Sequence, residues 1–166
     1  MSVLVRPETP TDVGAIREIN HAAFGVSVEA DLVDRLRADG DLLLSLVAER
    51  DGAIVGHCGF SRLTVRDAGR GAAAVSLGPV AVLPDCQRTG IGRRMIRDGI
   101  ARLVRGGETL IFVLGDPYYY GRFGFDAGAA TAYRTPYDGS YMQALRLSDE
   151  APGRGEVRYA PAFEPL

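Results

Sequence analysis

The chain has 166 residues, of which 46% are hydrophobic and 24% charged, and its formal charge is -2. This length allows one substantial core, and the small negative charge gives no basic field with which to hold nucleic acid. No apolar run is long enough to cross a bilayer, and no secretory leader is evident at the start. We therefore expect a single cytoplasmic domain over residues 1–166 that acts on neither nucleic acid nor membranes.

The first part of the chain predicts one short strand and two helices. LVRPETP begins with an apolar strand, and Thr9 with Pro10 then forms the start of a helix. Ser27 begins a second amphipathic helix, which Gly40 can end in the left-handed conformation. The apolar residues at helical spacing are Val13, Ile16, Ile19, Ala23 and Phe24 in the first helix and Val28, Leu32 and Leu36 in the second.

The next segment predicts an antiparallel meander of three strands. LLLSLVAER and AIVGHCGFSRLTV are apolar, strand-like runs, and Asp51-Gly52 between them suits a type I′ hairpin turn. The polar, glycine-rich RDAGRGA then leads into the third strand, AAAVSLGPVAV, which ends at Leu83-Pro84-Asp85.

The second half predicts a helix and a parallel strand. Apolar residues line one side of a helix that begins after Gly90 and ends at Gly106 and Gly107. The apolar run TLIFVL is expected to be a buried strand, so a βαβ crossover makes the sheet mixed. GDPYYYGRFGF is expected to be a turn with a short helix, YMQALRLS a last strand, and GRGEVRYAPAFEPL irregular. The expected fold is α/β (α+β), with a mixed central sheet of about six to seven strands flanked by about four helices.

The stretch CQRTGIGRRM, from Cys86 to Met95, carries the main functional signal. Gly90 and Gly92 follow a strand and open a helix, where unpaired N–H groups and the helix dipole favour an anion. A dinucleotide-binding turn would need glycine in place of Met95, and a Walker loop would need a lysine, which the chain lacks. The stretch can therefore accept an anion, but it matches neither of these phosphate-binding motifs.

QRTGIG, Gln87 to Gly92, follows the strand LGPVAV and Leu83-Pro84, and it resembles the Gln/Arg-x-x-Gly-x-Gly/Ala signature of GCN5-related N-acetyltransferases. GDPYYYGRFGF is similar to that family's Leu-Tyr-x-x-x-Gly-Phe segment, with Tyr120 at its tyrosine. The order of elements also resembles the family over essentially the whole chain. A bacterial subgroup with LGP before the loop, VLGDPxYYxRFGF after it and a tail like VRYAPAFE resembles the chain still more closely.

The resemblance implies an acyltransferase that uses acetyl-CoA as cosubstrate, needs no metal, and moves the acetyl group to a primary amine by direct attack in a ternary complex. The pantetheine arm would bind the backbone of Val80, Ala81 and Val82, one of whose N–H groups would polarise the thioester carbonyl. Tyr120 would return a proton to the departing thiolate. The pyrophosphate would lie on the loop, at Gln87, Arg88, Thr89, Gly90, Ile91, Gly92 and Arg93.

The catalytic assignment leaves alternatives open. The strand before the loop carries no glutamate, so His57, Glu49 or ordered water are the candidates for the general base. Tyr118 or Tyr119 could supply the hydroxyl in place of Tyr120. Without that glutamate, the chain could also be an acyl-CoA-binding sensor or interaction module that does not turn over.

The acceptor is open as well, and a small molecule or a peptide amine fits equally. The family's acceptor pocket would correspond to the region around residues 21–32 and 130–141. The carboxylates Glu29, Asp31 and Asp34 could attract a cationic amine. The protein is expected to be a monomer or a homodimer. Cys58 and Cys86 are expected to be reduced thiols.

Overall fold

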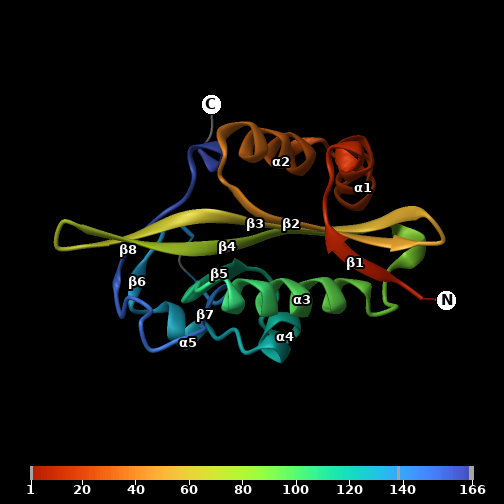
Figure 1. Cartoon of the computed structure of the whole chain (residues 1–166). Coiled ribbons are helices and arrows are strands. Elements are labelled where there is room, and N and C mark those ends of the chain that lie inside the picture. The colour runs from red at the N-terminus through yellow and green to blue at the C-terminus, as the bar shows by residue number, and fades with distance from the viewer. Residues whose placement is uncertain (1, 138, 165–166) are drawn as a thin grey trace. The chain divides into compact units, whose positions relative to one another are not determined.

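The computed structural model describes residues 2–137 and 139–164, and its helices and strands are labelled in Figure 1. The chain divides into two compact units, the first made of Met1–Phe60 with Pro79–Arg102 and the second of Ser61–Gly78 with Leu103–Leu166. Two long strands, β3 (Ala53–Asp67) and β4 (Arg70–Val82), contribute residues to both units. Within the described residues the hydrogen-bonded strand order is β1-β2-β3-β4-β5-β7, with β8 paired to β3 and β6 paired to β8.

Unit 1 contains a strand, two helices, the first hairpin and a third helix. Its elements besides β3 and β4 are β1 (Leu4–Pro7), α1 (Val13–Phe24), α2 (Val28–Asp39), β2 (Leu42–Arg50) and most of α3 (Ile91–Arg105). β1 pairs antiparallel with β2, from Leu4 opposite Glu49 to Pro7 opposite Leu46. The predicted first strand, two helices and hairpin are therefore confirmed.

The helices α1 and α2 begin and end near where the sequence predicts, but the residues they bury agree with the prediction only in part. A single 3-10 turn, Pro10–Asp12, precedes α1, and Gly40 ends α2 with a φ of 77° in the left-handed region, as predicted. The prediction that Val28 faces the core is wrong, because its side chain is 67% exposed. The buried residues of α2 are Ala30, Val33 and Leu36.

Both hairpin turns consist of two residues with positive φ. Asp51 and Gly52 have φ of 53° and 81°, which confirms the predicted type I′ conformation. Ala68 and Gly69 repeat it with 51° and 80°, so β3 and β4 extend further than the sequence predicted, through most of RDAGRGA. Polar residues continue these strands because their side chains lie on an exposed tip.

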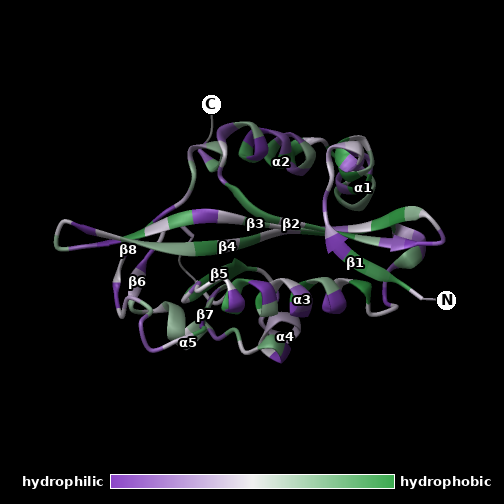
Figure 2. Cartoon of the chain, in the orientation of Figure 1, coloured by the Kyte–Doolittle hydropathy of each residue, from purple (hydrophilic) through white to green (hydrophobic). Residues whose placement is uncertain are grey.

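Helices cover both faces of the sheet in unit 1. The core residues Ile16, Val33 and Val47 join α1 and α2 to β2 on one face. On the other face, α3 packs so closely that a Cβ on Gly56 of β3 would lie 3.0 Å from Met95 and 3.1 Å from Ile91. Figure 1 shows α1 and α2 on one side of these strands and α3 on the other, and Figure 2 shows hydrophobic and hydrophilic residues alternating along α3.

Unit 2 holds the parallel part of the sheet. β5 pairs in parallel with β4, from Val75 opposite Ile111 to Leu77 opposite Val113, which confirms the predicted βαβ crossover and mixed sheet. β7 continues the sheet antiparallel to β5. The elements of this unit are β5 (Leu110–Leu114), α4 (Pro117–Tyr120), α5 (Ala127–Ala130), β6 (Tyr133–Arg134), β7 (Met142–Arg146) and β8 (Gly155–Arg158).

The prediction that the tail is irregular is wrong over β8. Residues Gly155–Arg158 pair antiparallel with β3, with Val157 opposite Val65 and both side chains in the core. β6 then pairs in parallel with β8. These two short strands bring the sheet to eight strands in the described residues, beyond the six to seven expected.

The core of unit 2 is continuous around β5. Phe112 of β5 meets Tyr133 of β6 edge to face, with ring centroids 5.0 Å apart. Arg62 of β3 makes two hydrogen bonds to the carboxylate of Glu108, at 2.7 and 2.9 Å.

No helix among the described residues is long and apolar enough to cross a membrane.

Candidate active site

The end of β4 leaves one backbone edge directed away from β3. Leu83 N–H donates to Val55 O at 2.9 Å, so residue 83 faces β3. Because backbone groups alternate in direction along a strand, Ala81 also faces β3, whereas the N–H and C=O groups of Val80 and Val82 point to the opposite edge. The paired part of β4 and β5 ends at Leu77, just before Gly78 and Pro79. Val80 and Val82 therefore direct their backbone groups to this edge, where Val82 O accepts a hydrogen bond from the side chain of Gln87.

The loop from Gln87 to Gly92 connects this edge to α3. A 3-10 turn, Pro84–Cys86, follows the strand, and the side-chain amide of Gln87 donates to Val82 O at 3.1 Å. Thr89 Oγ1 donates to Cys86 O at 2.6 Å, which closes the loop on itself. Gly90 O accepts from Arg94 N at 3.1 Å and so begins α3.

Two residues of the loop have left-handed backbone conformations. Arg88 has a φ of 63° and Gly90 a φ of 86°. Turns of this kind direct successive N–H groups to one concave side, and the first N–H groups of α3 have no acceptor within the helix. Non-glycine residues rarely adopt a positive φ, so the strain at Arg88 marks a backbone shape maintained by its surroundings. The loop thus combines two left-handed residues with the unpaired first N–H groups of α3.

Arginine side chains accompany the loop. Arg88 and Thr89 are exposed, and the guanidinium Nη2 of Arg93 lies 3.5 Å from the position of a Cβ on Gly90. Arg93 thus lies against the loop and adds positive charge at the helix N-terminus. Cys86 beneath the loop is buried, with its Sγ 2.9 Å from Arg50 Nη2.

Tyr120 lies at the end of α4 in unit 2. Asp116 caps this helix by accepting from Tyr118 N–H at 2.9 Å, and Tyr120 N–H donates to Asp116 O at 3.0 Å. The ring packs against the backbone of Gly115, where a Cβ would lie 2.5 Å from Tyr120 Cε2. It also meets Phe125 at 6.0 Å in an edge-to-face arrangement. Tyr120 is half-buried, and its ring is held by the contacts with Gly115 and Phe125.

The two neighbouring tyrosines have different surroundings. Tyr118 is 86% exposed. Tyr119 is covered by Arg122, whose guanidinium carbon lies 4.7 Å from the ring centroid, and packs edge to face against Phe123. Of the three, Tyr120 is the one packed on the turn between β5 and α4.

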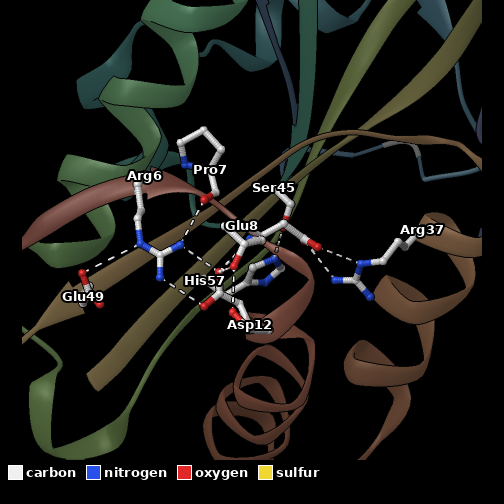
Figure 3. Close-up of polar contacts among 10 residues, drawn as sticks. Arg6, Pro7, Glu8, Asp12, Arg37, Ser45, Glu49 and His57 are labelled. Atoms are coloured by element: carbon white, nitrogen blue, oxygen red, sulfur yellow. Dashed lines mark hydrogen bonds and ion pairs between the residues drawn. The ribbon is translucent and has the colours of Figure 1, made fainter. Parts of the chain in front are cut away.

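His57 lies inside a buried hydrogen-bond network of unit 1, drawn in Figure 3. Asn20 donates to Ile16 O at 3.0 Å and to His57 Nδ1 at 3.1 Å, so Nδ1 is the acceptor. His57 Nε2 then carries the hydrogen and donates to Ser45 Oγ at 2.9 Å. Burial lowers the pKa of His57 to about 4. The ring is neutral and 0% exposed, which makes His57 unsuited to take a proton from a bound amine.

The same network connects β1, α2 and β2 through charged residues. Arg37 of α2 makes two hydrogen bonds to Glu8, at 2.8 and 2.9 Å, and Glu8 N–H donates to Ser45 O at 2.9 Å. Arg6 pairs with Asp12, whose pKa it lowers to about 2, and its Nε lies 3.8 Å from Glu49 (Figure 3). Glu49 is thus held by an arginine.

Two of the carboxylates considered for the acceptor have partners of their own. Arg17 of α1 pairs with Asp31 at 2.7 Å and with Asp34 at 2.8 Å, so these two residues join α2 to α1. Glu29 differs, because its Oε2 is buried and has no hydrogen-bond partner among the described residues.

Unit 2 contains a cavity over the segment considered for the acceptor. It has a volume of about 520 Å³ and is lined by Ala127, Ala130, Thr131, Tyr133, Arg134, Ser140 and Met142, among others. Residue 138 of this segment lies outside the described residues. Among the described residues, no group of His, Cys, Asp or Glu side chains could hold a metal ion.

Gly115, which lies under the ring of Tyr120, was not predicted from the sequence. Its need for glycine arises from the ring of Tyr120, which folds back over it, and no local pattern reveals that contact. The Gly-Asp-Pro run signals only the turn and the cap of α4.

Comparison with known proteins decides the family. A family model described as an acetyltransferase (GNAT) domain matches residues 4–128. The chain belongs to the GNAT family. This confirms the resemblance drawn from QRTGIG and from GDPYYYGRFGF, and with it the expectation of a GNAT-type N-acetyltransferase.

GNAT relatives with similar sequences occur in Escherichia coli. The uncharacterised N-acetyltransferase YjhQ of strain K12 is 42% identical over 130 residues, which cover 76% of this chain and 72% of YjhQ. The uncharacterised N-acetyltransferase YhbS of the same strain is 36% identical over 152 residues, which cover 90% of each chain.

Solved GNAT structures share the fold. YhbS from Escherichia coli, in complex with CoA, superposes with a TM-score of 0.89 and 34% identity over 97% of this chain and 91% of that one. A GNAT family acetyltransferase from Brucella melitensis, in complex with acetyl-CoA, superposes with a TM-score of 0.83 and 38% identity. This match covers 98% of this chain and 99% of that one. The fold predicted from the sequence is thus that of GNAT enzymes.

Proposed function

We propose that the chain, as a single catalytic domain, transfers the acetyl group of acetyl-CoA to a primary amine by direct attack in a ternary complex. The observation that carries the proposal is the backbone of the loop, with left-handed residues at Arg88 and Gly90 before the free N–H groups of α3. Such a cradle suits a pyrophosphate. Two similar GNAT proteins were crystallised with CoA and with acetyl-CoA, which supports the same ligand here.

The loop supplies the pyrophosphate site in this proposal. Backbone N–H groups from Arg88 to Gly92 point at the phosphate oxygens in this proposal, and Arg88 and Arg93 neutralise their charge. The N–H of Gln87 already donates to Pro84 O at 3.4 Å. Gln87 contributes differently, since its side chain is bound to Val82 O and holds the loop to the strand. Thr89 stabilises the turn through Cys86 O, and Ile91 anchors α3 in the core.

The free edge of β4 supplies the thioester site. An extended pantetheine arm can pair with the backbone groups of Val80 and Val82, which point away from β3, while Ala81 keeps the strand bonded to β3. One of the two outward N–H groups polarises the thioester carbonyl. Pro79 cannot donate to a ladder, which suits the point where the sheet pairing stops.

Tyr120 is the proposed acid. A free tyrosine has a pKa of about 10 and a thiol one of about 8.5, so donation from neutral tyrosine to the thiolate is uphill by about 2 kcal/mol. The tyrosine must therefore be positioned close to the sulfur, where proton transfer accompanies the breaking of the C–S bond. The aromatic packing of Tyr120 on Gly115 and Phe125 supports such a fixed position.

Deprotonation of the amine is assigned to Glu49 or to ordered water. His57 is the weaker candidate because both ring nitrogens are in buried hydrogen bonds. The acceptor is an amine on a small molecule or a peptide. The cavity in unit 2 that Ala130 and Met142 line is the candidate site for the acceptor's side chain. The protein acts as a monomer or a homodimer.

Calorimetric titration with acetyl-CoA tests the cofactor site. We expect micromolar binding for the wild type, weaker binding of dephospho-CoA and none of NADH. Gly90→Asp should abolish the binding because a side chain and a negative charge then occupy the cradle. The matched control is Gly69→Asp, which adds the same charge at a turn glycine with a similar φ, 80° against 86°. Unchanged affinity in Gly90→Asp would overturn the loop assignment.

Turnover distinguishes the enzyme from a sensor. CoA release in the presence of a panel of amines, followed with a thiol reagent, should require the acceptor and should fall at least tenfold in Tyr120→Phe. Tight binding of acetyl-CoA without release across the whole panel would instead support an acyl-CoA-binding module.

A further inference from the structure

Gln143 is a fully buried polar residue and the second residue of β7. It is 0% exposed and lies opposite Val113 of β5, between the buried residues Met142 and Ala144. A buried amide is costly unless it is hydrogen-bonded, so its contacts indicate why the position is polar.

The amide of Gln143 binds the turn on which Tyr120 lies. Gln143 Nε2 donates to Gly115 O at 3.0 Å and to Tyr141 O at 3.3 Å. Gly115 N–H in turn donates to Tyr141 O at 2.9 Å. Both backbone groups of Gly115 are therefore held, its N–H by Tyr141 just before β7 and its carbonyl by the side chain of Gln143.

The other end of the amide has no partner. Gln143 Oε1 is buried and accepts no hydrogen bond among the described residues. Turning the amide over would place this oxygen against two carbonyl oxygens, so the donors fix its orientation. An unpaired buried acceptor destabilises the fold, which a methionine or leucine of similar size would avoid. The position thus keeps the two N–H donors at a cost in stability.

Resting on the proposed role of Tyr120, we propose that Gln143 is a positioning residue, whose amide fixes Gly115 and thereby places the Tyr120 ring for proton transfer. Contact between Gly115 and the ring transmits the effect, because the ring lies where a Cβ of residue 115 would be. Gln143 itself does not touch the reacting atoms in this proposal.

Gln143→Met tests the proposal by removing both donors at similar volume. We expect kcat to fall about tenfold while the KM for acetyl-CoA stays within twofold, because the cofactor loop is unaltered. Ser61→Ala is the matched control, since it removes a second buried polar group of unit 2. The hydroxyl of Ser61, like Gln143 Oε1, has no hydrogen-bond partner among the described residues. Its kcat should stay within twofold of wild type. Wild-type kcat in a folded Gln143→Met would overturn the proposal.

Gln143→Glu adds a readout that a packing role would not give. A carboxylate facing two carbonyl oxygens binds a proton more readily than usual, and the protonated acid can donate to Gly115 O. We expect kcat within threefold of wild type at pH 6 and a loss approaching that of Gln143→Met at pH 9. A kcat ratio to wild type that does not change with pH would count against the proposal. This variant also serves if Gln143→Met fails to fold.

A measurement without turnover separates this proposal from the proposed function. With 13C-labelled tyrosine, the signal of Tyr120 among the seven tyrosines is assigned by its loss in Tyr120→Phe. Gln143→Met should move or broaden that signal, and Ser61→Ala should not. If the protein binds acetyl-CoA but never turns over, the proposed function fails while this signal still decides whether Gln143 places Tyr120. An unmoved signal would overturn the positioning role.

Discussion

The ring of Tyr120 occupies the space that a side chain at Gly115 would need. A Cβ at residue 115 would lie 2.5 Å from Cε2 and 3.0 Å from Cδ2 of that ring. Real Cβ atoms essentially never approach so closely, so even one methyl group must displace the ring. The position of the proposed catalytic acid therefore depends on a glycine five residues earlier in the chain.

Gly115→Ala should separate catalysis from cofactor binding. We expect kcat to fall tenfold or more because the Tyr120 hydroxyl moves, with the Kd for acetyl-CoA unchanged by calorimetry. Gly121→Ala is the matched control, because a Cβ there meets no atom within 4 Å and the φ of -57° suits alanine. Equal activity of the two variants would contradict the proposed dependence of Tyr120 on Gly115.

Arg88 offers a test that separates strain from charge. The left-handed backbone conformation costs an L-residue roughly 1–2 kcal/mol of folding free energy, and glycine avoids this strain. Glycine also makes the unfolded chain more flexible, which offsets part of that gain in stability. Arg88→Gly should therefore be more stable than Arg88→Ala by about 0.5–1 kcal/mol in urea unfolding. Both variants lose the guanidinium and should bind acetyl-CoA equally weakly. A higher affinity in Arg88→Gly would mean that loop shape, rather than charge, limits binding.

Local signals predicted those features that depend on neighbouring residues. Asp51-Gly52 specifies its turn because few residues tolerate two successive positive φ values. Gly40 ends α2 because glycine adopts the single left-handed conformation required there without strain. The strand and helix around QRTGIG were predictable because their periodicities differ clearly. These elements place the cofactor loop.

Features that depend on distant partners were not predictable. β8 is a strand because Val157 fits beside Val65, far away in sequence, and its four residues are too few to show a period. In α2 the sequence favoured a stripe of Val28, Leu32 and Leu36, whereas tertiary packing buries Leu36 together with Ala30 and Val33. A polar Gln143 inside an apolar strand was a signal in the sequence, but its meaning needed the contact with Gly115.

The cysteines should be inert while the protein is folded. Burial raises the pKa of the Cys58 thiol well above its usual range, and Cys86 is also buried, beneath the loop. A thiol reagent should label neither residue within the time of a CoA-release assay and should label two thiols per chain in denaturant. Rapid labelling of native protein that disappears in Cys86→Ser would indicate that the loop opens, and acetyl-CoA should then slow the reaction.

His57 should make the fold less stable as the pH falls. Its pKa is about 4 in the folded protein against 6.5 for the free side chain, because burial disfavours the charged ring. The unfolded chain therefore takes up a proton that the folded chain excludes. The contribution of neutral His57 to the free energy of unfolding is fully present above pH 6.5. It is lost as the pH falls from 6.5 to about 4, and the total loss is about 3 kcal/mol.

Urea unfolding between pH 7.5 and pH 5 measures this slope before most carboxylates titrate. Wild-type stability should fall by about 1.4 kcal/mol per pH unit through the lower part of that range. His57→Gln removes the titrating ring and should show a flatter dependence, whatever its stability at pH 7.5. NMR provides a direct check, because the chain has only two histidines and this variant identifies the signal of His57. An imidazole signal of His57 that titrates near pH 6.5 would show that Asn20 and Ser45 do not enclose the ring as described.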